Sequence, residues 1–231
     1  DEFVRLNKSI ENLIEKNSVI YRNQREFIEN AAHELQTPLA VFQAKIDTLI
    51  QLPDITQAQS EILSSLNDNI SKLNHLNKNL LLLSKIENNA YHNKESIIVN
   101  DIIQKNLFFF KEQAAARNIN IRTSFEQELK IDSNAALVEI MINNLLLNAI
   151  RHNIANGEIV IHIANHTLSI SNTGQQQGLS ADKLFVRFSK TTSEEQGNGL
   201  GLAIVKKIIE LNNWQIDYAL ENNLHVFTVT C

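Results

Sequence analysis

The first residues that could take part in chemistry lie in residues 27–39, which read FIENAAHELQTPL. His33 is followed by Glu34, and Thr37 lies one helical turn further on, on the same flank of a predicted helix. Pro38 has no N–H, so the helix is expected to bend there. A titratable imidazole beside a carboxylate, at a point of local weakness, is a candidate phosphoryl acceptor if the chain also binds a nucleotide. The alternative is that His33 is an ordinary solvated residue.

Four polar side chains of the helix predicted over residues 133–152 could bind such a nucleotide. At about 100° per residue they fall within one stripe, opposite the apolar side chains. The four residues are Asn144, Asn148, Arg151 and His152. Two carboxamides one turn apart can supply oxygen atoms to a hard cation, and an arginine beside them can neutralise phosphate. The alternative is the polar face of a surface helix.

A glycine-rich segment, GNGLGL, opens the helix predicted over residues 200–211. Glycines let backbone N–H groups approach an anion closely, and a helix N-terminus adds the positive end of its dipole. The residues that could line such a phosphate site are Gly197, Gly199, Leu200 and Gly201. A flexible loop followed by an ordinary helix start has the same pattern.

Two further segments contain candidate contacts. Asn172 and Gly174 follow a predicted strand, where they could bind the edge of a base or form a turn. In residues 184–190, LFVRFSK, Arg187 could point toward phosphates. The same segment could equally be an amphipathic plug that holds a loop to the body of the domain.

The composition limits the class of protein. With 231 residues, two prolines and six glycines, the chain favours long helices over an all-β fold. The net charge of −5 argues against general affinity for nucleic acid. Cys231 is the single cysteine, which favours a reducing compartment. No apolar run is long enough to span a bilayer. Because the chain begins with Asp rather than Met, we expect a fragment of a longer protein.

The first part of the chain is predicted to be a helical hairpin. Residues 1–30 have a loose helical pattern, and a coiled-coil seam extends it to about Leu49, before the turn at residues 52–54. A second helix is predicted over residues 56–89. The seam residues, spaced alternately by four and three, are Ile28, Ala32, Leu35, Leu39, Phe42, Ile46 and Leu49. Because a single hairpin leaves much of this apolar surface exposed, we expect two copies to form a four-helix bundle.

Residues 89–94 are polar and mark a predicted domain boundary, after which the periodicity changes. Strands are predicted over residues 96–100, 119–125, 158–164, 167–172, 214–220 and 224–229. Helices are predicted over residues 101–117, 133–152 and 200–211, with Ser133 as an N-cap candidate. The fold class predicted for the chain is therefore α+β: an antiparallel helical hairpin followed by an α/β sandwich with helices on one face of a largely antiparallel sheet.

The order of these pieces is more specific than any one of them. A His-Glu-x-x-Thr-Pro helix, an Asn-x-x-x-Asn helix, a strand ending in NTG, an LFxRF segment and a GxGLGL helix start follow one another. This arrangement resembles the sensor histidine kinases of two-component signalling over residues 27–227. The resemblance implies a dimerisation and phosphoacceptor domain in residues 1–90, with residues 1–26 as a signalling helix. It also implies an ATP-binding domain of the gyrase and chaperone type in residues 95–231.

The resemblance implies roles for individual residues. His33 would be the phosphoacceptor, and Glu34 the base that takes or orients its proton. Thr37 would position water when a phosphorylated response regulator is dephosphorylated. Asn148 would bind Mg²⁺, with Asn144 beside it. The residues implied in ATP binding are Asn144, Asn148, Arg151, His152, Asn172, Gly174, Arg187, Gly197, Gly199, Leu200 and Gly201.

The activity implied by the resemblance is autophosphorylation of His33 by Mg–ATP, followed by relay of the phosphoryl group to an aspartate of a response regulator. Phosphatase activity toward that regulator is also implied. The implied partners are a second copy of the chain and the receiver domain of the regulator, without nucleic acid. The chain would be the cytoplasmic part of an inner-membrane receptor, with membrane contact only through a part upstream of these residues.

Two positions depart from the family pattern. Gln36 stands where the family usually has arginine, which changes the charge beside the acceptor. Asn172 stands where the family usually has an aspartate that accepts a hydrogen bond from the adenine amino group. A neutral carboxamide oxygen can still accept that bond, so we expect retained but weaker nucleotide binding. Two alternatives stay open: a non-catalytic dimeric signalling adaptor with a degenerate ATP domain, and a nucleotide-hydrolysing machine of the gyrase or chaperone type.

Overall fold

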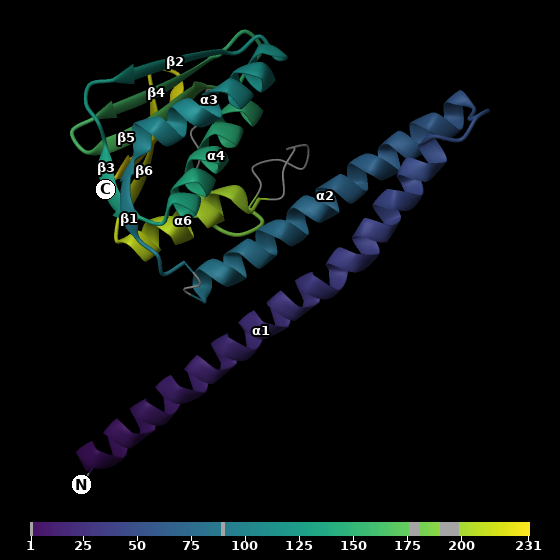
Figure 1. The fold of residues 1–231 in the computed structure, drawn as a ribbon. Coiled ribbons are helices and arrows are strands. Elements are labelled where there is room, and N and C mark those ends of the chain that lie inside the picture. Colours follow the sequence, from purple (N-terminus) through teal and green to yellow (C-terminus); the bar gives the residue numbers. More distant parts are fainter. Residues whose placement is uncertain (1, 89–90, 176–180, 190–198) are drawn as a thin grey trace. The chain divides into compact units, whose positions relative to one another are not determined.

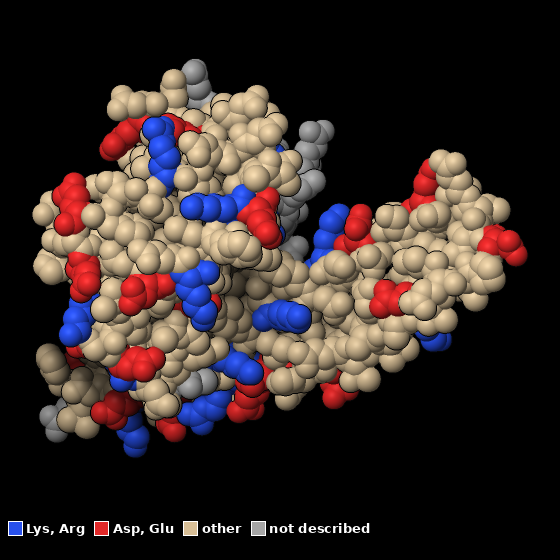
Figure 2. Space-filling model, turned by 45° about the horizontal axis from the view of Figure 1, so that its top comes forward, with Lys and Arg blue, Asp and Glu red and all other residues tan. Residues whose placement is uncertain are grey.

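The computed structural model describes residues 2–88, 91–175, 181–189 and 199–231. The chain forms two compact units, Asp1–Asn88 and Asn89–Cys231 (Figure 1). Among the described residues, none of the helices combines the length and the apolar character that a membrane span requires. Lys and Arg side chains are interspersed with Asp and Glu across the face shown in Figure 2, in keeping with the small net charge of −5.

The first unit is an antiparallel hairpin of α1 (Glu2–Ile50) and α2 (Gln57–Glu87) (Figure 1). Thr56 caps α2 with a complete capping box, because its hydroxyl accepts from the N–H of Gln59 and the Gln59 side chain accepts from the N–H of Thr56. α1 remains helical through Pro38, and Figure 1 shows that it changes direction along its length. A missing backbone hydrogen bond at a proline permits such a bend.

The apolar seam of α1 is divided between two surfaces. Every seventh residue, Ala32, Leu39 and Ile46, is buried, with 2%, 7% and 6% of its surface exposed. The seam residue three positions after each of these is about half exposed. These residues are Leu35, Phe42 and Leu49. One half of the seam therefore holds the hairpin together, and no part of the chain that the structure describes covers the other half.

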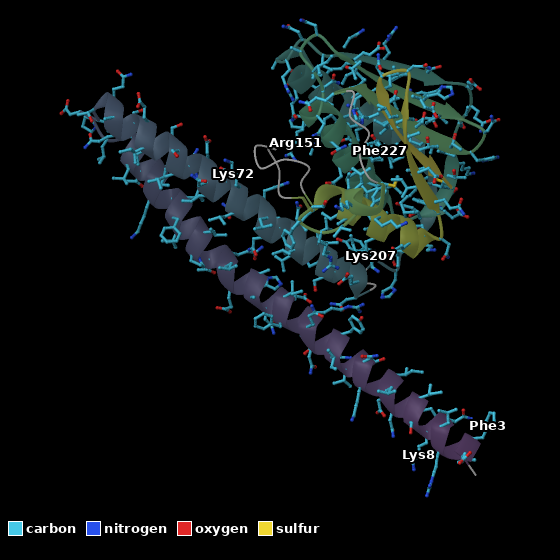
Figure 3. All side chains as sticks on the ribbon, turned by 180° about the vertical axis from the view of Figure 1, so that it is seen from behind. Phe3, Lys8, Lys72, Arg151, Lys207 and Phe227 are labelled. Atoms are coloured by element: carbon cyan, nitrogen blue, oxygen red, sulfur yellow. The ribbon has the colours of Figure 1, made fainter. Side chains whose placement is uncertain are left out.

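The N-terminal part of α1 extends beyond the packed part of the hairpin. All of residues 2–24 are exposed, including Phe3 and Lys8 (Figure 3). Packing ends at Arg25, whose Nη1 donates to the backbone carbonyl of Glu87 at the end of α2 over 3.0 Å. Beyond this level α2 supplies no surface against which α1 could bury an apolar stripe.

The second unit contains the remaining helices and strands. It begins with β1 (Glu95–Ile98), α3 (Val99–Ala115), β2 (Asn120–Phe125), β3 (Lys130–Ser133) and α4 (Ala135–Arg151). It continues with β4 (Glu158–Ala164), β5 (Thr167–Thr173), α5 (Ala181–Leu184), α6 (Gly201–Asn212), β6 (Gln215–Glu221) and β7 (Leu224–Thr230).

Five of the strands form one sheet in the order β2-β4-β5-β7-β6. β2 runs parallel to β4, and the other neighbours are antiparallel. β1 and β3 form a separate antiparallel pair. α3, α4 and α6 cover one face of the five-stranded sheet (Figure 1). The predicted α/β sandwich after a helical hairpin is confirmed.

The core of the second unit lies between α4 and the inner face of the sheet. Leu145 and Leu146 of α4, Ile161 of β4 and Ile170 of β5 are each no more than 1% exposed. Phe227 of β7 pairs with Ile170 in the sheet and is 3% exposed (Figure 3). Burial of each such side chain contributes about 1.5–3 kcal/mol, so this layer sets the position of α4 on the sheet.

The start of α4 corrects a prediction from the sequence. The N-cap is Asn134 rather than Ser133, because the Asn134 Oδ1 accepts from the N–H groups of Ala136 and Leu137. Ser133 ends β3, a strand that the sequence pattern did not reveal, and its hydroxyl donates to Asn212 Oδ1. A strand of four residues is too short to show a clear alternation of apolar and polar side chains.

Replacing Asn134 with alanine removes the oxygen that caps α4, and we expect the free energy of unfolding to fall by about 1 kcal/mol. Asn134→Asp keeps the capping oxygen and adds a negative charge at the helix N-terminus, but it loses the bond from Asn134 Nδ2 to the Asn93 carbonyl oxygen, so it should recover only part of this loss. Urea unfolding followed through Trp214, the single tryptophan of the chain, reports on the second unit. Equal stability of Asn134→Ala and the wild type would contradict the capping role.

Candidate functional site

His33 lies on the outside of the helical hairpin. His33, Glu34 and Thr37 are all exposed, whereas Ala32 beside them is buried. Asn77 of α2 ties the backbone at this level, because its Nδ2 donates to the carbonyl oxygen of Ala32 over 2.6 Å. Among the described residues, no hydrogen bond joins the His33 ring to Glu34 or Thr37. The imidazole is therefore accessible to a reactant, on a helical segment that a buried contact holds in place.

The predicted polar stripe of α4 is present in the structure. Asn144 and Asn148 are half-buried on the side of α4 that faces away from its core residues. Asn144 Nδ2 donates to the carbonyl oxygen of Ile140 over 2.8 Å. The Asn144 Oδ1 lies at the start of α6, because a Cβ atom added to Gly201 would be 2.9 Å from it. The stripe and the glycine-rich helix start therefore meet.

Arg151 (Figure 3) and His152 lie at the C-terminal end of α4, where both are exposed. Arg117 fixes this end by donating from Nη1 to the carbonyl oxygens of Ile150 and Arg151. Desolvation by the atoms around it lowers the pKa of Arg151 below its ordinary value. Arginine nonetheless stays protonated in proteins, so the group can bind an anion at neutral pH.

The start of α6 is shaped by its backbone. Gly199 has a φ of 64°, and a Cβ atom there would lie 2.9 Å from backbone atoms of Phe188 and Ser189. The N–H of Phe188 donates to the Gly199 carbonyl oxygen over 2.9 Å, which ties the turn carrying Arg187 to this helix start. Leu200 is fully buried, and no side chain of the described residues caps α6. The first N–H groups of α6 therefore remain available to an anion.

Asn172 lies at the end of β5 on the inner face of the sheet. It pairs with Ile159 on one side and His225 on the other, and it is 1% exposed. Its Nδ2 donates to the carbonyl oxygen of Thr173 over 2.8 Å. This bond fixes the orientation of the carboxamide and leaves Oδ1 as the acceptor for a ligand.

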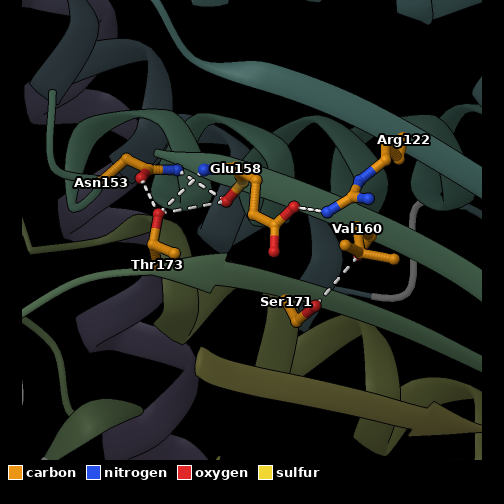
Figure 4. A network of polar contacts seen from close by, with 6 residues as sticks. All are labelled: Arg122, Asn153, Glu158, Val160, Ser171 and Thr173. Atoms are coloured by element: carbon orange, nitrogen blue, oxygen red, sulfur yellow. Dashed lines mark hydrogen bonds and ion pairs between the residues drawn. The ribbon is translucent and has the colours of Figure 1, made fainter. Parts of the chain in front are cut away.

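A polar network holds the end of α4 to the end of β5 (Figure 4). The hydroxyl of Thr173 donates to Asn153 Oδ1 over 2.5 Å, and Asn153 Nδ2 donates to the carbonyl oxygen of Glu158 over 3.1 Å. The N–H of Glu158 donates to the Thr173 hydroxyl over 2.9 Å. A Cβ atom on Gly174 would lie 3.2 Å from the His152 carbonyl oxygen, so the two segments also run close together there.

The structure thus brings the candidate residues into two groups. His33, Glu34 and Thr37 share the outside of α1, and the others lie on α4, at the end of β5 and around the start of α6. Gly197 lies outside the described residues. The stripe from Asn144 to His152 covers about 12 Å at 1.5 Å per residue. It can follow an extended ligand that runs between the start of α6 and the end of β5.

Sequence reasoning missed three residues that shape the β5 end. Asn153 and Thr173 form the network described above, and His225 is the cross-strand neighbour of Asn172. A signal for His225 was present, because alternation in residues 224–229 places it on the inner face with Phe227 and Val229. A histidine at a position where apolar residues are the rule marks a buried polar contact.

Two protein families match this chain. Residues 23–89 match the family described as His Kinase A (phospho-acceptor) domain. Residues 133–230 match the family described as histidine kinase-, DNA gyrase B-, and HSP90-like ATPase. The first match contains His33, and the second contains α4, the end of β5 and the start of α6.

Curated relatives include the heme sensor protein HssS of two staphylococci. The protein of Staphylococcus saprophyticus is 29% identical over 214 residues, and that of Staphylococcus aureus is 32% identical over 213 residues. In both comparisons 90% of this chain aligns with 46% of the relative. The chain therefore spans about half the length of the curated relatives it matches.

Solved structures share the fold. Histidine kinase AdeS of Acinetobacter baumannii has a TM-score of 0.59 at 23% identity, over 85% of this chain and 95% of that one. Full-length ShkA in complex with AMPPNP has a TM-score of 0.70 at 18% identity, over 88% of this chain and 45% of that one. The catalytic domain of histidine kinase ThkA has a TM-score of 0.52 at 27% identity, over 59% of this chain and 93% of that one.

Gly199 and Gly201 make a matched pair of substitutions. Gly199→Ala forces a left-handed backbone onto alanine and presses its Cβ against backbone atoms, so we expect a loss of about 1–3 kcal/mol in the free energy of unfolding. Gly201→Ala meets only the tip of the Asn144 side chain and should change stability by less than about 1 kcal/mol. Urea unfolding monitored through Trp214 compares them, and equal losses would show that the backbone at Gly199 is not constrained.

Proposed function

Because this chain belongs to the sensor histidine kinases, we propose that it transfers the γ-phosphoryl group of ATP to His33 and passes it to an aspartate of a response-regulator receiver domain. One combination of features carries the proposal. An exposed histidine on a helical hairpin and an ATPase-type site built on α4, β5 and α6 occur in one chain. An exposed histidine alone, or a polar helix face alone, is common in proteins of many functions. Together the two features supply an acceptor for a phosphoryl group and a site for its donor.

In the proposed reaction, a neutral ring nitrogen of His33 attacks the γ-phosphorus. A P–N bond forms, the bond from the γ-phosphorus to the bridging oxygen breaks, and ADP leaves with that electron pair. The second ring nitrogen carries a proton, which Glu34 accepts as positive charge develops on the ring. Glu34 and His33 are adjacent on the helix, and no hydrogen bond joins them in the described part of the chain, so Glu34 must change rotamer when the donor docks.

Residues of the second unit supply position and charge. Asn172 accepts from the adenine amino group, and the first N–H groups of α6 bind phosphate oxygens together with Arg151. Arg187 and His152 add contacts to the phosphate chain. Since phosphoryl transfer depends mainly on positioning and charge neutralisation, such a site needs no further acid or base of its own.

Mg²⁺ fits the donor set on α4. The carboxamide oxygen of Asn148, half-buried one turn from Asn144, is a hard ligand of the kind that Mg²⁺ accepts. One protein ligand is enough where phosphate oxygens and water complete the octahedron. The ion would neutralise charge on the triphosphate.

Thr37 and the receiver domain belong to the same proposal. Thr37 lies one turn from His33 on the exposed flank of α1, where it can hold a water molecule against the phosphorylated aspartate of a bound regulator. This would give the chain phosphatase activity. The chain would form the cytoplasmic part of a membrane receptor. The sensing part would correspond to the portion of the relatives that does not align with this chain.

A homodimer is supported by the uncovered half of the α1 seam. Gln43 Nε2 donates to Asn67 Oδ1 over 2.7 Å, which sets α1 and α2 in register and places Phe42 near the level of Leu66. Both of these side chains are about half exposed. A second hairpin could cover this stripe and complete a four-helix bundle. The heptad spacing of Phe3, Leu6, Ile10 and Leu13 can extend the pairing along the N-terminal part of α1.

The adaptor alternative rests on Gln36, which removes a positive charge beside His33, and on Asn172, which replaces a charged acceptor by a neutral one. An adaptor with a degenerate domain would give no heat on titration with Mg–ATP. The geometry favours retained binding, because the Asn172 carboxamide is oriented by Thr173 with its oxygen left as an acceptor.

Replacing His33 with glutamine should abolish labelling of the chain by γ-³²P-ATP while Mg–ATP binding in calorimetry stays within about twofold, because His33 lies outside the ATP site. The label on the wild type should be lost in acid, as expected for a P–N bond. His75→Gln, in the other helix of the hairpin, is the matched control and should label normally. Labelling of His33→Gln at the wild-type level would remove His33 from the role.

Replacing Phe42 with glutamate should break the dimer. It removes an apolar side chain worth about 1.5–3 kcal/mol per copy and places a charge in the interface, so the dissociation constant should rise at least about 100-fold. Ala44→Glu puts the same charge on the opposite side of α1, at an exposed position, and should leave the dimer intact. Sedimentation equilibrium measures both, and an undisturbed Phe42→Glu dimer would place the interface elsewhere.

A further inference from the structure

We propose that His225 is a positioning residue of the nucleotide site: it fixes the backbone of Gly174 and Gln175 and so sets the place of Asn172 at the base end. This inference rests on the proposed function, because it assigns a role within the ATP site. His225 lies on β7, far in sequence from α4 and α6, and it is not among the residues that the family resemblance implies.

The sheet register places His225 directly beside Asn172. The two residues are cross-strand partners in the antiparallel pair of β5 and β7, so their side chains project from the same face. Both are buried, with 8% and 1% of their surface exposed. A polar ring thus lies next to the carboxamide that is proposed to accept from adenine.

Two hydrogen bonds determine the state of the His225 ring. Nε2 lies 2.9 Å from the carbonyl oxygen of Gln175, and Nδ1 lies 2.8 Å from the hydroxyl of Tyr218 on β6. A carbonyl oxygen can only accept, so Nε2 carries the proton and donates to Gln175. In the neutral ring Nδ1 is then an acceptor, and the Tyr218 hydroxyl donates to it. A single neutral tautomer therefore satisfies both partners.

Gly174 shows how closely the ring approaches the segment after β5. A Cβ atom on this residue would lie 2.5 Å from His225 Cδ2 and 2.7 Å from Nε2. Only a residue without a side chain leaves room for the ring at this distance. The stacked ring of Tyr218, with its centroid 6.0 Å away, supports the imidazole from β6.

The segment from Asn172 to Gln175 is therefore held from both sides. Asn153 binds the hydroxyl of Thr173 on the α4 side (Figure 4), and His225 binds the carbonyl of Gln175 on the sheet side. The Asn172 carboxamide takes its orientation from Thr173, which lies between these two anchors. Because Asn172 offers one neutral hydrogen bond to adenine, small displacements of its oxygen should change binding.

A pair of amide substitutions separates the two contacts of the ring. Glutamine places its amide nitrogen near the position of Nε2, so His225→Gln can still donate to Gln175. Asparagine places its amide near the position of Nδ1, so His225→Asn keeps only the Tyr218 contact. We expect the dissociation constant for Mg–ATP, measured by calorimetry on the whole chain, to rise about three- to tenfold in His225→Asn, as for the loss of one hydrogen bond. In His225→Gln it should stay within about twofold of wild type.

Initial rates of autophosphorylation give a second readout that a purely structural histidine would not produce. Because His225 acts at the base end, His225→Asn should raise the ATP concentration that gives half the maximal initial rate and leave the maximal rate nearly unchanged. Tyr218→Phe removes the donor to Nδ1 and keeps the Gln175 carbonyl as acceptor, so ¹⁵N NMR of the imidazole should still show the single Nε2–H tautomer of the wild type; a shift to Nδ1–H would contradict the bond to Gln175.

The outcomes are distinct. Equal Mg–ATP affinity in His225→Asn and His225→Gln, at either the wild-type or a weakened level, would overturn the positioning role. The same holds if the maximal initial rate and the half-maximal ATP concentration change together with a fall in melting temperature. If the wild-type chain itself bound no Mg–ATP, the proposed function would fail first, and the inference would fall with it.

Discussion

The packing of α4 on the sheet is the constraint on which the nucleotide site depends. Leu145 and Leu146 are fully buried, so α4 cannot rotate about its axis without exposing core side chains. This fixes Asn144 and Asn148 on the opposite side of the helix. Because α6 and β5 both pack against α4, the donors at the start of one and the acceptor at the end of the other are placed relative to the same body.

The two ends of the site are held by different means. At the α6 end backbone contacts hold the segment, since Gly199 and Phe188 lie too close together for a side chain on Gly199 to fit. At the β5 end side chains hold the segment, through Asn153 on one side and His225 on the other. A neutral Asn172 needs such support more than an aspartate would, because only one of its two polar ends can accept a hydrogen bond.

The hairpin exposes the His33 ring to solvent while the backbone of α1 beside it is held in place by α2. Ala32 is buried and its carbonyl oxygen accepts from Asn77, so the backbone beside His33 is anchored while the ring faces solvent. Asn77 and Ser84, one heptad apart on α2, each bury a polar oxygen that has no partner among the described residues. The core of this part of the hairpin is therefore less apolar than the part around Ile46 and Ile70, which lowers the cost of local rearrangement.

The sequence by itself determined the hairpin, most strands, the polar stripe of α4 and the exposed place of His33, because these follow from periodicity and from glycine and proline within a few residues. Tertiary structure alone decided which half of the α1 seam is buried, since that depends on where α2 lies. It also revealed β3, moved the cap of α4 to Asn134 and joined His225 to Gln175, residues that are 50 apart in the chain. The physical reason is that strand pairing and register bring such residues together, and neither is encoded in the local pattern of either segment.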